Sequence, residues 1–235
     1  MKFFTHSIFI ILLTFSSSYS QNIQQHTEHF FISHPETISH HWIEKSKQSL
    51  ERAYTRVSQF FNDQLKSIVI VILYDKTWQF VQATSLPYYI GGVYDGTLQL
   101  QHPRILHHKG ILNKLLTHEI THIFVNQTSD NNVPLWLNEG LAVYVAGESY
   151  PIRMNIKIRS FRHLNQLLRD RKNKRKMRYG YQLSGEIVSY LINNYGKMKL
   201  ISFLKRLKSE KVEIAFESIY KQTFQLFEKR VLKLK

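Results

Sequence analysis

Residues 118–122 read HEITH and residues 134–142 read PLWLNEGLA, and these two stretches decide the fold that we expect. Apolar residues recur with helical spacing on both sides of the first stretch, which predicts that it lies on a helix. His118 and His122 would then share one face, one turn apart, and could direct two ring nitrogens at one metal ion. Glu119 would lie about 100° around the helix from His118, where it could reach a water on that ion without replacing a ligand.

The alternative is a surface helix that holds these three residues by chance. The flanking residues argue against it because they are apolar enough to bury the helix. They are Leu115, Leu116, Ile120, Ile123 and Phe124. Burying a carboxylate and two imidazoles without a metal or other partners would cost several kcal/mol. The flanks therefore favour a metal site over a chance match.

Glu139 is the best candidate for a third ligand, because catalytic zinc sites usually have three protein ligands. It is a lone acid in a strongly apolar stretch, residues 135–146, that we predict to be a second helix. Gly140 beside it would let the backbone of another element come close. Residues 123–138 are enough for the first helix to end and for the chain to turn, so that the second helix packs back across the first. The alternative interpretation of Glu139 is a carboxylate on the helix surface.

The HEITH stretch followed by N-E-G resembles the gluzincin zinc metallopeptidases, in which a glutamate is the third zinc ligand. The chain looks most like the small bacterial peptidase-MA-like domains, over about residues 28–230. The resemblance implies that His118, His122 and Glu139 bind one zinc ion. It also implies that Glu119 is the catalytic base.

The resemblance further implies an edge strand near residues 95–100, along which a peptide substrate would lie. An extended peptide does need a sheet edge to pair with, so the residues agree with this expectation. A tyrosine often follows in this region of the family, and Tyr181 is our candidate for stabilising the oxyanion. The alternative role of Tyr181 is ordinary amphipathic packing.

Two features depart from the family pattern. The Gly-rich motif by which aminopeptidases of the same clan hold a free amino terminus is not recognisable, and the interval between His122 and Glu139 is shorter than in those enzymes. Some related enzymes also have a carboxylate four residues after the ligand glutamate, where this chain has Val143. A residue that orients a ligand histidine must therefore come from elsewhere.

Strand patterns precede the two motif helices and helix patterns follow them. This order predicts an α+β, zincin-like fold: a small mixed sheet, an active-site helix pair and a mainly helical C-terminal half. The expected strands are residues 28–33, a buried strand at 67–74 and a hairpin within 88–101. The expected helices are residues 37–62, 78–84, 111–125, 135–146, 160–168, 181–194, 198–208 and 223–234. Residues 126–132 and the pair at 107–108 are expected in loops.

The N-terminus has the pattern of an export signal. Lys2 is followed by the apolar run IFIILLTF at residues 8–15 and then by SSSYS at residues 16–20, with a small residue on each side of Tyr19. The apolar run has about half the ~20 residues that a membrane-spanning helix needs, so we expect cleavage near Ser20 and a mature chain that starts at Gln21. The alternative is an uncleaved anchor. The remainder, residues 21–235, is expected to form a single domain, exported to the periplasm or secreted.

The composition limits the chemistry and indicates a basic surface. The chain has no Cys, which excludes disulfides, thiolate metal sites and a Cys nucleophile, and its 32 Lys and Arg against 17 Asp and Glu give a net charge of +15. The run from Arg169 to Arg178 reads RDRKNKRKMR. It is either a solvated loop between helices or a contact with an anionic envelope surface. Nucleic acid is not expected, because the chain carries an export signal and the run lacks stacking aromatics.

The function expected from the sequence is that of an exported zinc-dependent peptidase, in which a zinc-bound water is activated by Glu119 and attacks a peptide bond. Its partner would be a peptide or protein substrate. One alternative is a binding module that keeps the zinc site without proteolysis, and another is an amidase that acts on amides of the cell envelope.

Overall fold

The computed structural model describes residues 22–233, so the expected export signal and its cleavage site lie outside the described residues. The strands form one mixed sheet in the order β1-β2-β3-β5-β4. Their bounds are β1 Asn22–His26, β2 Phe30–Pro35, β3 Val69–Leu73, β4 Gly92–Tyr94 and β5 Leu98–Leu100. β2, β3 and β5 are parallel, whereas β1 and β4 pair antiparallel at the two edges. Helices make up most of the rest, and the predicted α+β, zincin-like fold class is confirmed.

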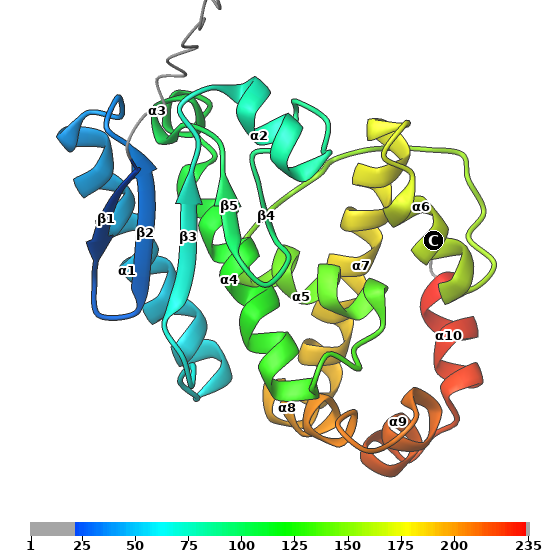
Figure 1. The fold of residues 1–235 in the computed structure, drawn as a ribbon. Coiled ribbons are helices and arrows are strands. Elements are labelled where there is room, and N and C mark those ends of the chain that lie inside the picture. The colour runs from blue at the N-terminus through cyan, green and yellow to red at the C-terminus, as the bar shows by residue number, and fades with distance from the viewer. Residues whose placement is uncertain (1–21, 234–235) are drawn as a thin grey trace, which may run out of the picture.

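Helices cover one face of this sheet (Figure 1). α1 (His40–Phe61) lies behind the first strands and packs against α4 (Leu112–Ser129). Side chains in β3 therefore alternate: Val71 is buried, whereas Ile70 is 49% exposed. The prediction of a fully buried strand at 67–74 was wrong on this point. A continuous apolar run does not reveal that only one face of its sheet is covered.

The helix pair of the two motifs is α4 and α5 (Leu135–Ala146). α5 has the predicted bounds, but α4 extends to Ser129 through part of the expected loop at 126–132. The hydroxyl of Ser129 donates a hydrogen bond of 2.8 Å to the Val125 carbonyl one turn back, which lets a polar residue stay buried in the helix. α4 ends at Asp130, whose φ of 52° is left-handed.

Five helices form the C-terminal half, and α7 is the longest of them. They are α6 Phe161–Arg169, α7 Lys174–Tyr195, α8 Lys197–Arg206, α9 Val212–Tyr220 and α10 Phe224–Lys233. α7 begins well before the predicted 181, so the second half of the basic run is helical rather than a loop. The side chain of Asn173 caps it by accepting from the backbone N–H of Lys176. None of the described helices combines the length and apolar character needed to cross a bilayer.

Three short elements were not predicted. β1 lies in a stretch without a clear apolar pattern, and α9 was missed although apolar residues recur in it with helical spacing. α3 (Pro103–His108) places His107 and His108 on a helix instead of in a loop. Proline at the first position of α3, and the His102 ring that accepts from the Arg104 N–H, start this helix. α2 (Thr77–Thr84) agrees with the sequence.

α5 and α7 pack with almost no space between their backbones, and this contact fixes where Glu139 lies. A Cβ at Gly140 would overlap the carbonyl oxygen of Ser184 on α7. A Cβ at Gly185 would come within 2.6 Å of Val143 Cγ1 on α5. The prediction that Gly140 allows the close approach of another backbone is confirmed.

Replacing Gly140 by Ala is expected to destabilise the protein, because the added methyl must push α7 away from α5. We expect a loss of about 1–3 kcal/mol in the free energy of unfolding, despite the higher helix propensity of alanine. Urea unfolding followed by circular dichroism measures it. Lys199→Ala on the exposed side of α8 is the control and should change stability by less than about 0.5 kcal/mol. A Gly140→Ala variant as stable as the wild type would contradict the proposed contact.

Candidate metal centre

α4 and α5 bring together the three residues that the sequence predicted as ligands. Glu139 Oε2 lies 3.3 Å from His118 Nε2 and 3.6 Å from His122 Nε2. One possible ligand atom from each of these residues lies within 4.8 Å of the others, and this is the one group of at least three such residues among those described. The two imidazole rings belong to successive turns of α4, with centroids 4.8 Å apart. The cluster could hold one metal ion.

The geometry and chemistry of the three donors fit zinc. Ligand atoms about 2.0–2.1 Å from a tetrahedral ion lie roughly 3.3–3.4 Å from each other, close to the distances from the Glu139 oxygen. That oxygen is buried and has no hydrogen-bond partner of ordinary geometry. A buried carboxylate oxygen without a hydrogen bond is costly unless a cation satisfies it.

The electrostatics of the cluster also favour a cation. Burial lowers the pKa of His118, but the adjacent carboxylates of Glu148 and Glu139 raise it by more, so this pKa lies well above its usual value. Burial raises the pKa of Glu139, yet the neighbouring His122 and His118 lower it overall. The carboxylates of Glu119, Glu139 and Glu148 gather around the two rings, and a divalent ion held among them would balance their negative charge.

Both candidate histidines are oriented by partners on α5 or just beyond it. His122 Nδ1 lies 2.8 Å from Asn138 Oδ1, and His118 Nδ1 lies 3.2 Å from Glu148 Oε2. Because both partner atoms are acceptors, each Nδ1 must carry the proton that it donates. Nε2, which lies beside Glu139 in both rings, is then the nitrogen that would bind a metal ion.

Sequence reasoning did not find these two orienting residues. Asn138 was part of the quoted motif but received no role, although its place beside Glu139 was a usable signal. Glu148 follows Gly147, whose φ of 63° ends α5 and turns the chain back toward α4. Tyr150 donates a hydrogen bond of 2.6 Å to the same Glu148 oxygen. No spacing rule in the sequence reveals a contact made after such a turn.

Glu119 is buried on α4 and is hydrogen-bonded to the edge of the sheet. Its Oε2 accepts a hydrogen bond of 3.0 Å from the backbone N–H of Tyr94 on β4. Burial raises the pKa of Glu119 above its ordinary value. The edge strand expected near residues 95–100 is instead β4, because β5 lies inside the sheet between β3 and β4. The hairpin was predicted, but which of its strands lies outermost depends on long-range pairing.

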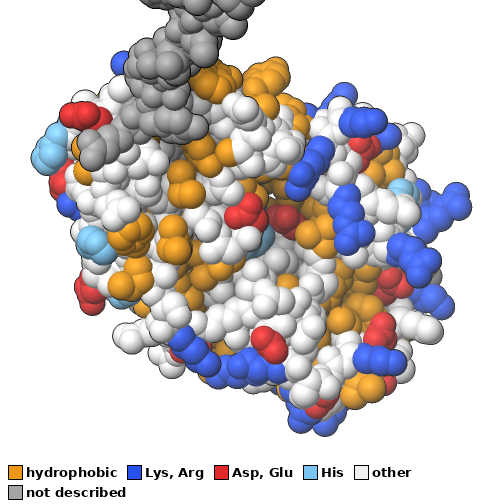
Figure 2. Space-filling view, viewed as in Figure 1, with side chains coloured by type: hydrophobic (Ala, Val, Ile, Leu, Met, Phe, Trp, Pro, Cys, Tyr) orange, Lys and Arg blue, Asp and Glu red, His pale blue; other side chains and the backbone are white. Residues whose placement is uncertain are grey.

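A cleft of about 380 Å³ opens beside these residues, between the β4 region and α7. Its lining includes His118, Glu119 and Glu148, and Figure 2 shows acidic and histidine side chains at the bottom of a hollow. Tyr181 also lines it, with its ring centroid 6.1 Å from that of His118. The Glu139 carboxylate and burial raise the pKa of Tyr181 well above its ordinary value, so its hydroxyl stays protonated and can donate.

The fold and the cluster together define the class: an α+β protein of the zincin-like type with a possible metal centre at its helix pair. The family model described as "Peptidase MA superfamily" matches residues 55–231, and the chain belongs to this family. Peptidases of this superfamily are typically zinc-dependent, which agrees with the three donors. No curated protein matches the chain.

Purified protein is expected to contain about one zinc ion per chain, which His118→Ala and Glu139→Ala should remove because each deletes a buried donor. Elemental analysis by mass spectrometry measures the content. His107→Ala changes a histidine outside the cluster and should leave zinc in place. Zinc retained by both cluster variants would assign the metal to another part of the chain.

Glu148→Ala is expected to weaken zinc binding by about 10–100-fold, because His118 loses the acceptor that orients its ring. Glu148→Gln keeps an acceptor oxygen and should lose less. Competition with a chromogenic chelator measures both affinities, and Glu213→Gln on α9 is a surface control. The same affinity in Glu148→Ala and the wild type would show that the contact does not support the site.

Proposed function

We propose that the protein is an exported zinc-dependent peptidase that hydrolyses peptide bonds. The observation that carries this proposal is the convergence of His118, His122 and Glu139 on one point, with Glu119 held beside them at the edge of the sheet. Membership of the peptidase MA superfamily supports it. The pattern is that of a gluzincin, since the third donor is a glutamate.

The two histidines and Glu139 would hold the zinc ion. A bound ion of this kind polarises the scissile carbonyl and lowers the pKa of water toward ~7. Glu148 and Asn138 keep the two rings in place, so the donors need no rearrangement on binding.

Glu119 would act as the general base. It takes a proton from the attacking water as the new C–O bond forms, and it passes that proton to the amine nitrogen as the C–N bond breaks. The raised pKa makes this carboxylate a stronger base toward the attacking water than an ordinary one, while its acid form can still protonate the much more basic leaving amine. The N–H of Tyr94 keeps its carboxylate at the sheet edge.

The peptide would pair with β4, whose outer side has no strand partner in the described sheet. An added strand uses main-chain hydrogen bonds for affinity, and the scissile bond is then brought past Glu119. Tyr181 would donate a hydrogen bond to the oxyanion from the opposite wall of the cleft.

The pattern of residues 1–20 supports export to the periplasm or the outside of the cell, with cleavage near Ser20. Residues 21–235 would then be the mature enzyme, a single domain. A chain without cysteine needs no disulfide to be stable in that environment.

Glu119→Gln is expected to lower the cleavage of a denatured protein by about 10²–10⁴-fold and to leave the zinc content unchanged, because it removes the base and no metal donor. Gel electrophoresis and mass spectrometry of the fragments measure cleavage. Glu44→Gln, which changes a partly exposed side chain of α1, is the control. Equal cleavage by Glu119→Gln and the wild type, or none by zinc-loaded wild type, would refute the peptidase. In the second case the protein would be a zinc-dependent binding module.

A further inference from the structure

The mouth of the cleft carries positive charge from two elements. Lys114 on α4 and Lys174 and Arg178 on α7 all line it, together with His118 and Glu119. All three basic residues are exposed. In Figure 2, blue Lys and Arg side chains stand along the right-hand rim of the hollow whose floor holds acidic and histidine groups. Two of the seven basic residues in the run from Arg169 to Arg178, Lys174 and Arg178, therefore face the proposed catalytic centre.

These cations have no acidic partner within the described part of the chain. The Lys and Arg ion pairs of residues 22–233 are made by Lys47, Lys76 and Arg206, all elsewhere. The acids of the cleft already have other partners. Glu119 accepts from Tyr94, and Glu148 accepts from Tyr150 and lies beside His118.

A contact across the end of the cleft holds part of this basic rim in place. The hydroxyl of Tyr89, from the loop before β4, donates a hydrogen bond of 2.5 Å to the backbone carbonyl of Arg171. Lys174 Nζ lies 4.7 Å from the centre of the Tyr89 ring. Burial and the nearby Arg178 and Lys109 lower the pKa of Lys174, as expected for a group of like charges that an anion would relieve.

Apolar side chains also line the cleft, next to its acidic and histidine groups. Ile90, Ile111, Leu115 and Met177 line the same cleft. A group that fits both surfaces has a short hydrocarbon part and a carboxylate at its end. Glutamate and aspartate side chains, and the C-terminal carboxylate of a peptide, all have this form.

We propose that Lys114, Lys174 and Arg178 select peptides that carry a carboxylate next to the scissile bond, either on an acidic side chain or at the C-terminus. This inference rests on the proposed peptidase function for its reaction, but the recognition itself needs no catalysis. It assigns the basic run a role in substrate choice.

The sheet indicates the side on which the carboxylate lies. A peptide that pairs antiparallel with β4, the slightly stronger arrangement, runs opposite to Gly92–Tyr94. Its C-terminal part then lies next to residues 89–92, which border the basic rim. The carboxylate should therefore be on the side of the leaving amine.

Binding to the Glu119→Gln variant tests the recognition without turnover. The probe is a short fluorescent peptide of Ala, Ser and Leu with one central Glu, compared with the same peptide carrying Gln. Each is made with a free and with an amidated C-terminus, which separates the two sources of a carboxylate. We expect the Glu or free-acid peptide to bind about tenfold more tightly than the neutral one, a difference reduced by high salt.

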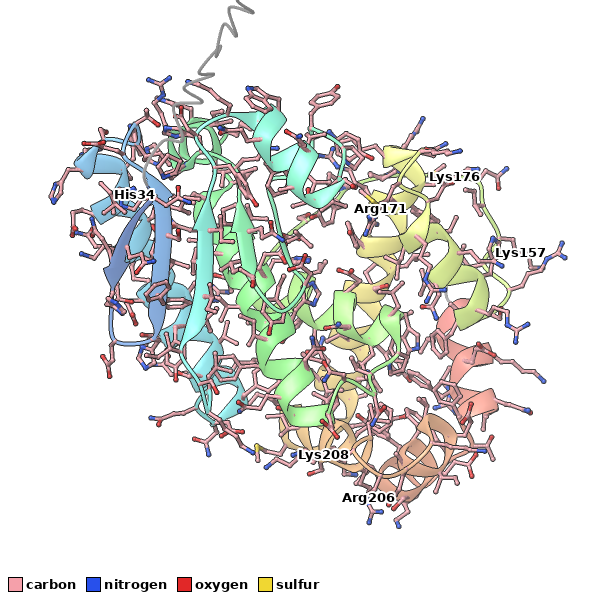
Figure 3. All side chains as sticks on the ribbon, viewed as in Figure 1. His34, Lys157, Arg171, Lys176, Arg206 and Lys208 are labelled. Atoms are coloured by element: carbon pink, nitrogen blue, oxygen red, sulfur yellow. The ribbon has the colours of Figure 1, made fainter. Side chains whose placement is uncertain are left out.

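Two double substitutions locate the preference. Lys174→Gln with Arg178→Gln should abolish it. Lys172→Gln with Lys176→Gln removes the same charge from the same run but from residues that do not line the cleft, and should preserve it. Figure 3 shows Lys176 on the outer side of α7, away from β4.

Equal binding of the acidic and neutral peptides would overturn the inference. An equal loss of the preference for the acidic peptide in the two double variants would also overturn it, because it would indicate a general polyanion-binding surface. Cleavage of the same peptides by zinc-loaded wild type, read by mass spectrometry, is scored separately. Preferential binding without cleavage would refute only the peptidase. Cleavage without preference would refute only the carboxylate selection.

Discussion

The site depends on one buried carboxylate held between two imidazoles. Glu139 Oε2 is within 3.6 Å of both His Nε2 atoms, in a helix whose other residues are almost all apolar. The position of that oxygen is set by α5 lying against α7 through Gly140, where no side chain could fit. A shift of α7 would move the carboxylate out of reach of the α4 histidines. The packing of α5 on α7 therefore also sets the geometry of the candidate metal site.

The same helix pair is connected to the sheet and to the cleft wall. Glu119 accepts from the Tyr94 N–H, so the proposed base and the strand that would hold a peptide share a direct hydrogen bond. Glu148 and Tyr150, just after α5, close the other side of the site. The proposed base Glu119, the candidate donor His118 and the basic rim therefore line a single cleft, although they come from elements far apart in the chain.

Several features were predictable from sequence because they are local. A periodicity of 3.6 residues gave α5 its bounds and placed His118 and His122 on one face of α4. Errors occurred where a pattern is ambiguous or pairing is long-range. Polar residues 126–129 continue α4, where the Ser129 hydroxyl bonds back to Val125 and the Gln127 side chain bonds to the backbone of Gln64 and Lys66. The order of β4 and β5 depends on which of them pairs with β3, and both strands have only three residues.

Local sequence patterns were enough to predict the candidate donor set, since helix geometry fixes how two histidines four residues apart are placed and a buried acid in an apolar helix needs a partner. The sequence also determined the α+β class through the order of its patterns. Only the tertiary structure decided that Glu148 orients His118, that Tyr94 holds Glu119, and that Lys174 and Arg178 face the cleft. These contacts join residues across turns and between elements, where separation along the chain carries no information about distance in space.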